Sequence, residues 1–224
     1  MRSNRYVLLF MSSITIVLGI LLSLAATALK DRQERNVQID MKKNILRSLN
    51  IPEDSAQKLT ADEIESLFDQ YIKMIQVNEK GDIVNAGGLP IYVKEVDGKE
   101  AGHSIPISGK GLWSTIYGYL AIEPDGETVK GITFYKHGET PGLGGEIEKD
   151  WFTSSFVGKK IVTPDGTPCS IEISKGKVSE DNPRKYCMVD GISGATMTSK
   201  GVSNFIEKDL KTYGEYFKHI RANQ

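Results

Sequence analysis

The residues best placed to do chemistry lie in one short, hydroxyl-rich stretch near the C-terminus, DGISGATMTS at positions 190–199. It joins a predicted strand over 187–189 to a helix predicted over 197–220 from apolar residues at helical spacing. Unpaired backbone N–H groups and the positive end of the helix dipole converge at such a junction, which therefore suits an anion. An ordinary capped helix start, with Thr198 or Ser199 as the N-cap, is the simpler interpretation of the same residues.

Two further segments are predicted to be glycine-containing loops. The segment HGETPGLGGE at 137–146 follows a predicted strand and contains four glycines, and SIPISGKGLW at 104–113 precedes another strand. Glycines let the backbone approach something flat or bulky, although a plain glycine-rich turn is their commoner use. Neither segment is a G-x-G-x-x-G inside a βαβ unit or a Walker A loop, so the sequence disfavours a dinucleotide-binding or P-loop fold.

Composition and spacing disfavour several other kinds of chemistry. The formal net charge of −1 gives no basic surplus of the kind that marks a nucleic-acid surface. Cys169 and Cys187 are the only cysteines, and they support neither a zinc nor an iron–sulfur site. They could form one disulfide in an oxidising compartment or serve as small buried hydrophobic residues. Because the three histidines are scattered and no nucleophile–base pair stands out, we predict no metal site and no catalytic residues in this chain.

An uncharged run of 24 residues, 6–29, is long enough to cross a bilayer as a helix. A cleaved signal peptide is the alternative, because residues 25–28 (AATA) resemble a cleavage site. The run, however, exceeds the usual apolar core of about 7–15 residues in a signal peptide, so a retained single-pass anchor is the preferred interpretation. Arg2 and Arg5 precede the run and three basic residues closely follow it, so the positive-inside rule does not assign the orientation.

The rest of the chain alternates between helical and strand-like patterns. An amphipathic helix is predicted over 31–50, ended by Ile51-Pro52-Glu53, and a second helix follows the capping box Thr60-Ala61-Asp62-Glu63. Asp-Gly pairs between short apolar runs predict hairpins, including one over 117–135. The strands are predicted at 75–77, 83–86, 91–96, 117–122, 129–135, 160–162 and 170–173.

These elements predict an α+β fold, in which one N-terminal transmembrane helix is followed by a mainly antiparallel, curved sheet with packed helices. We divide the chain into an anchor at 1–30, a helical linker at 31–73 and a sheet domain at 74–224. The three motifs described above fall within the sheet domain, which should therefore position them.

Three motifs together resemble those of a known family. The loop Asp190-x-x-Ser193-Gly194-Ala195-Thr196 resembles the acceptor signature for covalent flavin attachment. Residues 137–145 resemble the H-G-E-T-P-G-L-G segment of FMN-binding domains, and KGLWSTIYGY at 110–119 looks like the companion loop of that domain. From the apolar run to the last helix, the chain is similar to the C subunits of sodium-translocating NADH:quinone oxidoreductases.

The resemblance implies that a flavin transferase uses FAD to esterify FMN, through its phosphate, to Thr196, and that residues 74–224 form an FMN-binding domain. Asp190 would serve recognition by that enzyme or, alternatively, accept backbone N–H bonds as a turn residue. For Trp113 the alternative is a core position, and for Glu139 it is an exposed, solvated carboxylate. The other implied flavin contacts are Ser193, Gly194, Ala195, Thr198, His137, Glu139, Thr140, Leu143, Gly144, Leu112 and Trp113.

By the same resemblance the chain is an electron-carrying subunit, not catalytic alone, of a respiratory complex that oxidises NADH, reduces quinone and pumps Na⁺. Its partners would be subunits A, B, D, E and F and the lipid bilayer, without nucleic acid. The family places the soluble domain on the periplasmic side of a bacterial inner membrane. The alternatives are the equivalent G subunit of the ion-motive ferredoxin:NAD oxidoreductase, or a membrane-anchored extracytoplasmic binding module without a redox role.

Overall fold

The computed structural model describes residues 3–52 and 59–223 of the chain. Its contacts form two compact units, Met1–Asp40 and Met41–Gln224, and each is described by itself. The three-part division at residues 30 and 73 stays a prediction. Arg2 and Glu53, which entered the sequence arguments, lie outside the described residues.

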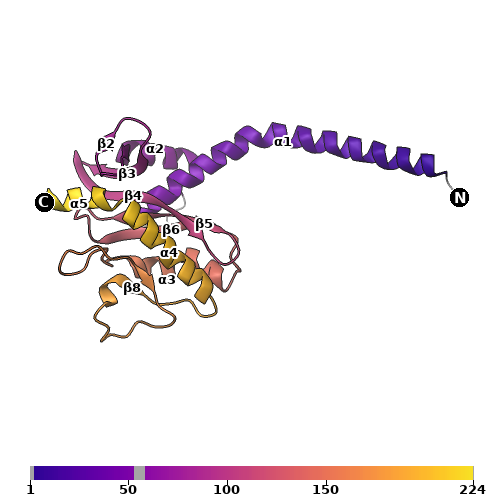
Figure 1. Cartoon of the computed structure of the whole chain (residues 1–224). Helices are drawn as coiled ribbons and strands as arrows, with labels where there is room; N and C mark the ends of the chain where they lie inside the picture. Colours follow the sequence, from indigo (N-terminus) through magenta and orange to yellow (C-terminus); the bar gives the residue numbers. More distant parts are fainter. Residues whose placement is uncertain (1–2, 53–58, 224) are drawn as a thin grey trace. The chain divides into compact units, whose positions relative to one another are not determined.

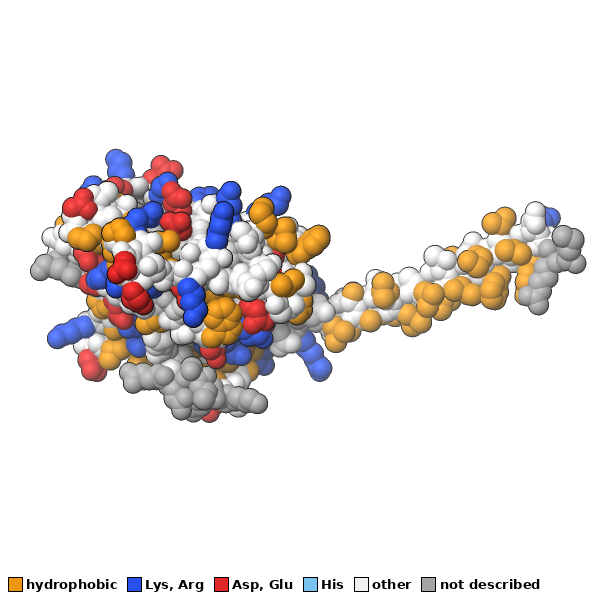
Figure 2. Space-filling model, turned by 90° about the horizontal axis from the view of Figure 1, so that it is seen from below, with side chains coloured by type: hydrophobic (Ala, Val, Ile, Leu, Met, Phe, Trp, Pro, Cys, Tyr) orange, Lys and Arg blue, Asp and Glu red, His pale blue; other side chains and the backbone are white. Residues whose placement is uncertain are grey.

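The first unit consists of the N-terminal part of α1 (Asn4–Ser48). This helix is long and apolar enough to cross a membrane, and none of its most apolar stretch is buried. Figure 2 shows its apolar side chains as orange atoms along the rod. These findings are consistent with the predicted span over 6–29. The helix continues beyond residue 40, as the pattern over 31–50 predicts, and ends shortly before Pro52.

The second unit is built on one antiparallel sheet, as predicted. α2 (Ala61–Tyr71) leads into it and begins at the predicted capping box, in which Thr60 and Glu63 each bond the other's backbone N–H. The predicted hairpin over 117–135 is confirmed, because its two strands pair antiparallel across the turn at Asp125-Gly126. Neighbouring strands in this sheet follow the order β2-β1-β3-β4-β5-β6. Along the chain the strands are β1 (Ile72–Val77), β2 (Ile83–Val84), β3 (Leu89–Val96), β4 (Lys99–Lys110), β5 (Thr115–Ile122) and β6 (Val129–Lys136).

The prediction of a loop over 104–113 is wrong for most of its length. Residues as far as Lys110 belong to β4, where Ile105 and Ile107 are buried in the core. Burying each of these side chains contributes about 1.5–3 kcal/mol relative to leaving it exposed. This gain outweighs the low propensity of nearby Gly109 for a strand. Only residues 111–114 remain as a loop between β4 and β5.

The edge of β4 explains why a proline is tolerated inside a strand. Pairing between β3 and β4 stops at Ser104, so further along β4 this edge has no strand neighbour among the described residues. Ser108 N–H points to this edge and donates to the Asp209 carboxylate of the last long helix at 2.8 Å. Pro106 has the same orientation along the strand, so its missing N–H removes no bond between strands.

Short elements follow the sheet, and here the predicted strands were too long. The segment 160–162 contributes only isolated bridges, from Lys160 to Thr128 and from Val162 to Pro168. The strand predicted over 187–189 is confirmed for residues 188–189, which form β8 and pair in parallel with β7, whereas Cys187 ends a short helix. The elements are η1 (Gly144–Glu148), α3 (Asp150–Thr153), η2 (Ser154–Phe156), β7 (Glu172–Ile173), η3 (Lys185–Cys187) and β8 (Met188–Val189).

Two helices, rather than the single predicted helix over 197–220, end the chain: α4 (Thr196–Thr212) and α5 (Gly214–Ala222). The break falls at Tyr213, whose side chain is buried and whose hydroxyl donates to the Pro90 carbonyl of β3 at 3.1 Å. Figure 1 shows α4, in gold, packed along the sheet against β4. A Cβ at Gly109 would lie 2.3 Å from the Cβ of Phe205, so this close packing requires glycine there.

Buried His103 in β4 gives the fold a predictable acid sensitivity. Its ring packs against Tyr216 and Phe217, and Nδ1 lies 3.1 Å from the Tyr216 hydroxyl. Burial lowers the pKa of His103 to about 4, from an ordinary value of 6.5. The Glu100 carboxylate, 3.8 Å from Nε2, is largely exposed and does not offset the burial.

Below pH 6.5 the unfolded chain therefore binds a proton at His103 that the folded chain does not. We expect the free energy of unfolding to fall by about 2 kcal/mol between pH 7 and pH 5 from this group alone. Urea denaturation of the wild type and of His103→Gln at both pH values measures it, since the glutamine variant lacks this contribution. Equal pH dependence in the two proteins would contradict the prediction.

Candidate functional site

The loop between β8 and α4 is held by its backbone, while its hydroxyl groups face solvent. Gly191 N–H donates to the Gly176 carbonyl at 2.9 Å, and a Cβ on Gly191 would lie 2.1 Å from a neighbouring carbonyl oxygen. Gly194 has a φ of +72°, which favours glycine. Ser193 and Thr196 are both exposed. The loop therefore has a defined shape with two accessible hydroxyls.

α4 begins at Thr196, earlier than the predicted N-cap at Thr198 or Ser199. Buried Ala195 is the N-cap and makes no side-chain bond. The first intrahelical bond runs from Ser199 N–H to the Ala195 carbonyl at 2.9 Å, so the N–H groups of 196–198 have no acceptor within the helix. No residue in the ranges 3–52 and 59–223 hydrogen-bonds the Thr196 hydroxyl. An exposed hydroxyl thus lies at the positive end of a 17-residue helix.

Glu139 joins the three motifs that the sequence singled out. Glu139 is only 5% exposed, and its carboxylate accepts a hydrogen bond of 2.6 Å from the Thr198 hydroxyl in α4. The backbone N–H groups of Leu112, Trp113 and Ser114 donate to the same carboxylate at 3.2, 3.0 and 3.3 Å. The alternative of an exposed, solvated carboxylate is therefore wrong, and so is the assignment of Thr198 as an N-cap.

The donors around Glu139 decide its charge. Burial alone would raise the pKa of this carboxyl, but the hydrogen bonds from Thr198, Trp113, Ser114 and Leu112 together hold the pKa below its ordinary value of 4.5. The side chain is therefore ionised at neutral pH. The carboxylate is hydrogen-bonded to Thr198 in the first turn of α4, where the helix dipole stabilises a negative charge.

Three glycines of the motifs allow this close approach. A Cβ on Gly111 would lie 2.5 Å from Glu139 Oε1, and a Cβ on Gly144 would lie 2.6 Å from the Thr198 hydroxyl. A Cβ on Gly194 would lie 2.7 Å from Leu143 Cδ2, so these two residues touch. The glycines thus serve the packing of the three loops against one another.

Large apolar side chains are exposed on the segments that meet at Glu139. Trp113 is 70% exposed, so the alternative of a core position is wrong for it, and Leu112 and Leu143 are nearly half exposed. Met197, beside Thr196, is also exposed and was not predicted. Met197 lies between the two threonines and outside the apolar stripe of the helix, and this position could have indicated in the sequence that its side chain is exposed. Together these residues offer apolar surface near an exposed hydroxyl.

The remaining predicted residues take supporting positions. His137 Nδ1 accepts the Glu139 N–H at 3.2 Å, and its Nε2 lies 3.4 Å from a carboxylate oxygen of Glu148. Thr140 is exposed, and its carbonyl accepts the N–H groups of Leu143 and Gly145 in the 137–146 loop. Asp190 accepts a backbone N–H, as its alternative role has it, but the donor is Val178, twelve residues earlier, at 2.8 Å and not a residue of its own turn.

A cavity of about 1060 Å³ opens beside Thr196, and nothing in the sequence motifs indicated it. Its lining comes from α4, α5 and the segment around 161–175, and it includes Lys175 and, one helical turn from Thr196, Lys200. The Ser199 hydroxyl is buried in this lining without a hydrogen-bond partner among the described residues. Lys200 lies one helical turn after Thr196, a spacing that the sequence did offer as a signal. This end of the cavity can therefore hold negative charge.

Comparison with known proteins gives the site a context. The family described as FMN-binding domain matches residues 111–211, a range that contains Glu139, Thr196 and the segments they join. The chain is 32% identical to the C subunit of the Na(+)-translocating NADH-quinone reductase of Yersinia pestis, over 96% of this chain and 92% of the relative.

Two solved structures are also similar. The C subunit of the Na(+)-translocating NADH-quinone reductase from Parabacteroides distasonis matches with a TM-score of 0.74 and 33% identity, over 84% of this chain and 96% of the other. The NqrC structure from Shewanella oneidensis matches with a TM-score of 0.71 and 25% identity, over 85% and 99%. Each likeness covers more than four-fifths of this chain and therefore extends well beyond the motifs.

Proposed function

Because this chain belongs to the family of the C subunits of Na(+)-translocating NADH-quinone reductases, we propose that it carries FMN bonded covalently, through its phosphate, to the Thr196 hydroxyl. Membership makes the chain a component of an oxidoreductase complex, with an FMN-binding domain. The observation that carries the proposal is the exposed Thr196 hydroxyl at the first residue of α4, to which no described residue hydrogen-bonds.

The residues around Thr196 fit a phosphoester. A phosphodiester keeps one negative charge, and the N–H groups of 196–198 stabilise it by about 0.3–1 kcal/mol at an exposed helix end. Lys200, one turn further along α4, adds positive charge. The apolar side chains of Trp113 and Leu143 offer contacts to a flavin ring, and Glu139 fixes the backbone that presents Trp113. Bound FMN supplies reversible electron transfer.

Attachment requires a second protein. A threonine hydroxyl is a weak nucleophile at neutral pH and needs an activating base. A flavin transferase would remove the proton and use FAD, so that the Thr196 oxygen bonds to the FMN phosphorus while the phosphoanhydride breaks and AMP leaves. The small residues Gly194 and Ala195 leave the approach to Thr196 open. Asp190 at the start of the loop, exposed apart from its bond to Val178, is available for recognition.

Within the complex the chain would relay single electrons on the path from NADH to quinone, with subunits A, B, D, E and F as neighbours. Residues 6–29 contain no charged side chain, so a path for pumped Na⁺ should lie in other subunits. We place the sheet domain on the periplasmic side of a bacterial inner membrane. The NADH-quinone reductase names of the relatives favour this role over that of a ferredoxin:NAD oxidoreductase component.

The decisive measurement is the intact mass of the full-length protein produced together with its flavin transferase. We expect the mass to exceed that of the polypeptide by one FMN less one water. Protein made without the transferase is the control and should have the unmodified mass. An unmodified mass from native membranes would contradict the proposal and leave the alternative of a binding module without a redox role.

A further inference from the structure

The two cysteines of the chain, Cys169 and Cys187, have no part in the proposed function, yet the fold brings them together. Segment 162–168 turns back on itself, with an antiparallel bridge between its ends, and thereby places Cys169 beside Lys160. The Lys160 N–H donates to the carbonyl of Tyr186, the residue before Cys187, at 2.8 Å. One residue, Lys160, therefore contacts the chain at both cysteines.

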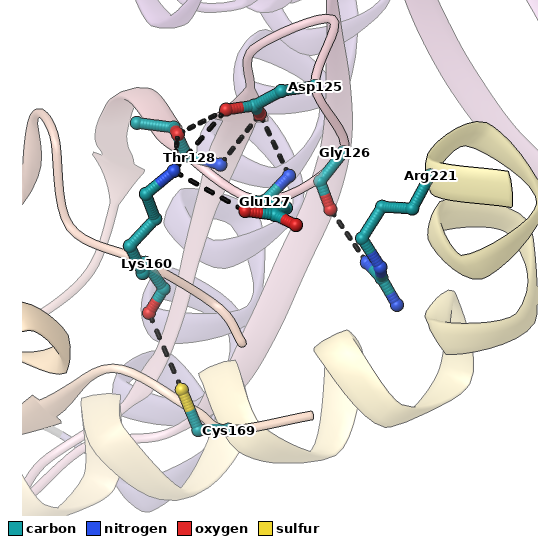
Figure 3. Close-up of polar contacts among 7 residues, drawn as sticks. All are labelled: Asp125, Gly126, Glu127, Thr128, Lys160, Cys169 and Arg221. Carbon is teal, nitrogen blue, oxygen red and sulfur yellow. Dashed lines mark hydrogen bonds and ion pairs between the residues drawn. The ribbon is translucent and has the colours of Figure 1, made fainter. Parts of the chain in front are cut away.

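The position of Cys169 is fixed by the turn of the β5–β6 hairpin. Figure 3 shows its sulfur directed at the Lys160 carbonyl oxygen, 3.6 Å away. The Lys160 ammonium is in turn 2.6 Å from the Thr128 hydroxyl and 3.5 Å from the carboxylates of Asp125 and Glu127. The segment that carries Cys169 is thus anchored to the main sheet.

The two thiols are packed against each other. Cys187 is completely buried in the core, and Cys169 is half-buried against the same core. Burial first, and then Cys187 through its charge and a hydrogen bond, raise the pKa of Cys169 to about 12. At pH 7 such a thiol is almost wholly protonated, so it does not serve as a reactive thiolate in the folded domain.

We propose that Cys169 and Cys187 are joined by an intramolecular disulfide bond, which forms as the domain folds in an oxidising environment. The bond would close the segment 169–187, which leads through β8 into the acceptor loop. Closing it restricts the unfolded chain and so stabilises the folded domain. Because Cys187 is completely buried and Cys169 is half-buried, the bond is structural and largely protected from reductants in the folded protein.

The reaction needs a disulfide as oxidant, such as oxidised glutathione or a protein disulfide. In the unfolded or partly folded chain, one cysteine thiolate attacks this disulfide, bonds to one of its sulfurs and releases the other as a thiol. The second cysteine then attacks the mixed disulfide, closes the bond between Cys169 and Cys187 and releases the second thiol. Two electrons and two protons pass from the cysteines to the oxidant.

Counting thiols tests the proposal. The purified full-length protein is refolded from urea in a buffer with excess oxidised glutathione, quenched with acid, denatured and treated with N-ethylmaleimide before intact-mass analysis. We expect no maleimide and a mass lower by two hydrogens, and two maleimides after prior reduction. Two maleimides without reduction, or a protein carrying glutathione, would overturn the proposal.

Matched variants separate the crosslink from packing. In Cys169→Ser the remaining cysteine, Cys187, cannot form the bond, so after removal of any attached glutathione this variant should react with one maleimide. It thereby calibrates the thiol count. Reduction during unfolding should lower the Tm of the wild type by several degrees and leave that of a Cys169→Ser/Cys187→Ser double variant unchanged. Equal effects on both proteins would refute a stabilising crosslink. Neither readout depends on flavin, so this inference and the proposed function fail or stand separately.

Discussion

Alanine at position 196 should leave the protein without covalently bound flavin. The substitution removes the hydroxyl oxygen that we propose as the acceptor of the phosphoester. The loss of stability should be small, because the position is exposed and its hydroxyl makes no hydrogen bond to a described residue. Coexpressed with the flavin transferase, Thr196→Ala should show no flavin fluorescence in a denaturing gel. Its intact mass should be that of the bare polypeptide.

Two variants make this result specific. Thr196→Ser keeps a hydroxyl at the same place and should retain some attachment, although serine alters the fit to the transferase. Thr212→Ala removes a hydroxyl at the far end of α4, where it bonds the Lys208 carbonyl, and should be fully flavinylated. Fluorescence that survives in Thr196→Ala would mean that another residue is the acceptor.

Replacing Glu139 with alanine should have the second-largest effect, on both folding and cofactor attachment. The substitution leaves three backbone N–H groups and the Thr198 hydroxyl without their acceptor. Since each buried donor left unsatisfied costs about 1–3 kcal/mol, and water reaches some of them, we expect a loss of about 3–5 kcal/mol in the free energy of unfolding. Flavin incorporation should fall as well, because the loops around Thr196 lose their shared anchor.

Urea denaturation at pH 7 measures this loss, with Glu207→Gln as the control. Glu207 is exposed on α4 and pairs with Lys211 at the surface, so its substitution should change stability by less than about 1 kcal/mol. The pKa of Glu139 is lowered on folding, so its contribution is present above the ordinary value of 4.5 and is lost as the pH falls through the lowered pKa. The gap between wild type and Glu139→Ala should therefore narrow in acid; a gap that is small at pH 7 would refute the anchoring role.

What the sequence could predict of the fold was local. The capping box at Thr60 and the hairpin turn at Asp125-Gly126 depend on residues within a few positions of each other, and both are present. Residues 104–110 pair with β5 along their whole length, but on their other edge the N–H of Ser108 is bonded by Asp209, about a hundred residues further along the chain. No local pattern contains that information, and Pro106 pointed the other way.

The same limit applies to the candidate site. Each of the three motifs can be recognised by itself in the sequence. The role of Glu139 could not be predicted in this way, because its hydrogen-bond donors come from the 111–114 loop and from α4. A glutamate in a glycine-rich loop is expected to be solvated, and only the fold supplies four donors to it. Likewise the N-cap prediction failed because Thr198 uses its hydroxyl across the site instead of on its own helix.

The bond between Ser108 and Asp209 has one more consequence. Beyond Ser104, this edge of β4 would otherwise present unpaired backbone N–H and C=O groups, with which a strand from a second molecule could pair. α4 covers this edge and also begins at Thr196, the proposed flavin acceptor, so a single helix would both protect against self-association and present the attachment point. Substitutions that weaken the packing of α4 on β4 should therefore reduce the yield of unaggregated protein and, with it, the yield of protein that carries flavin.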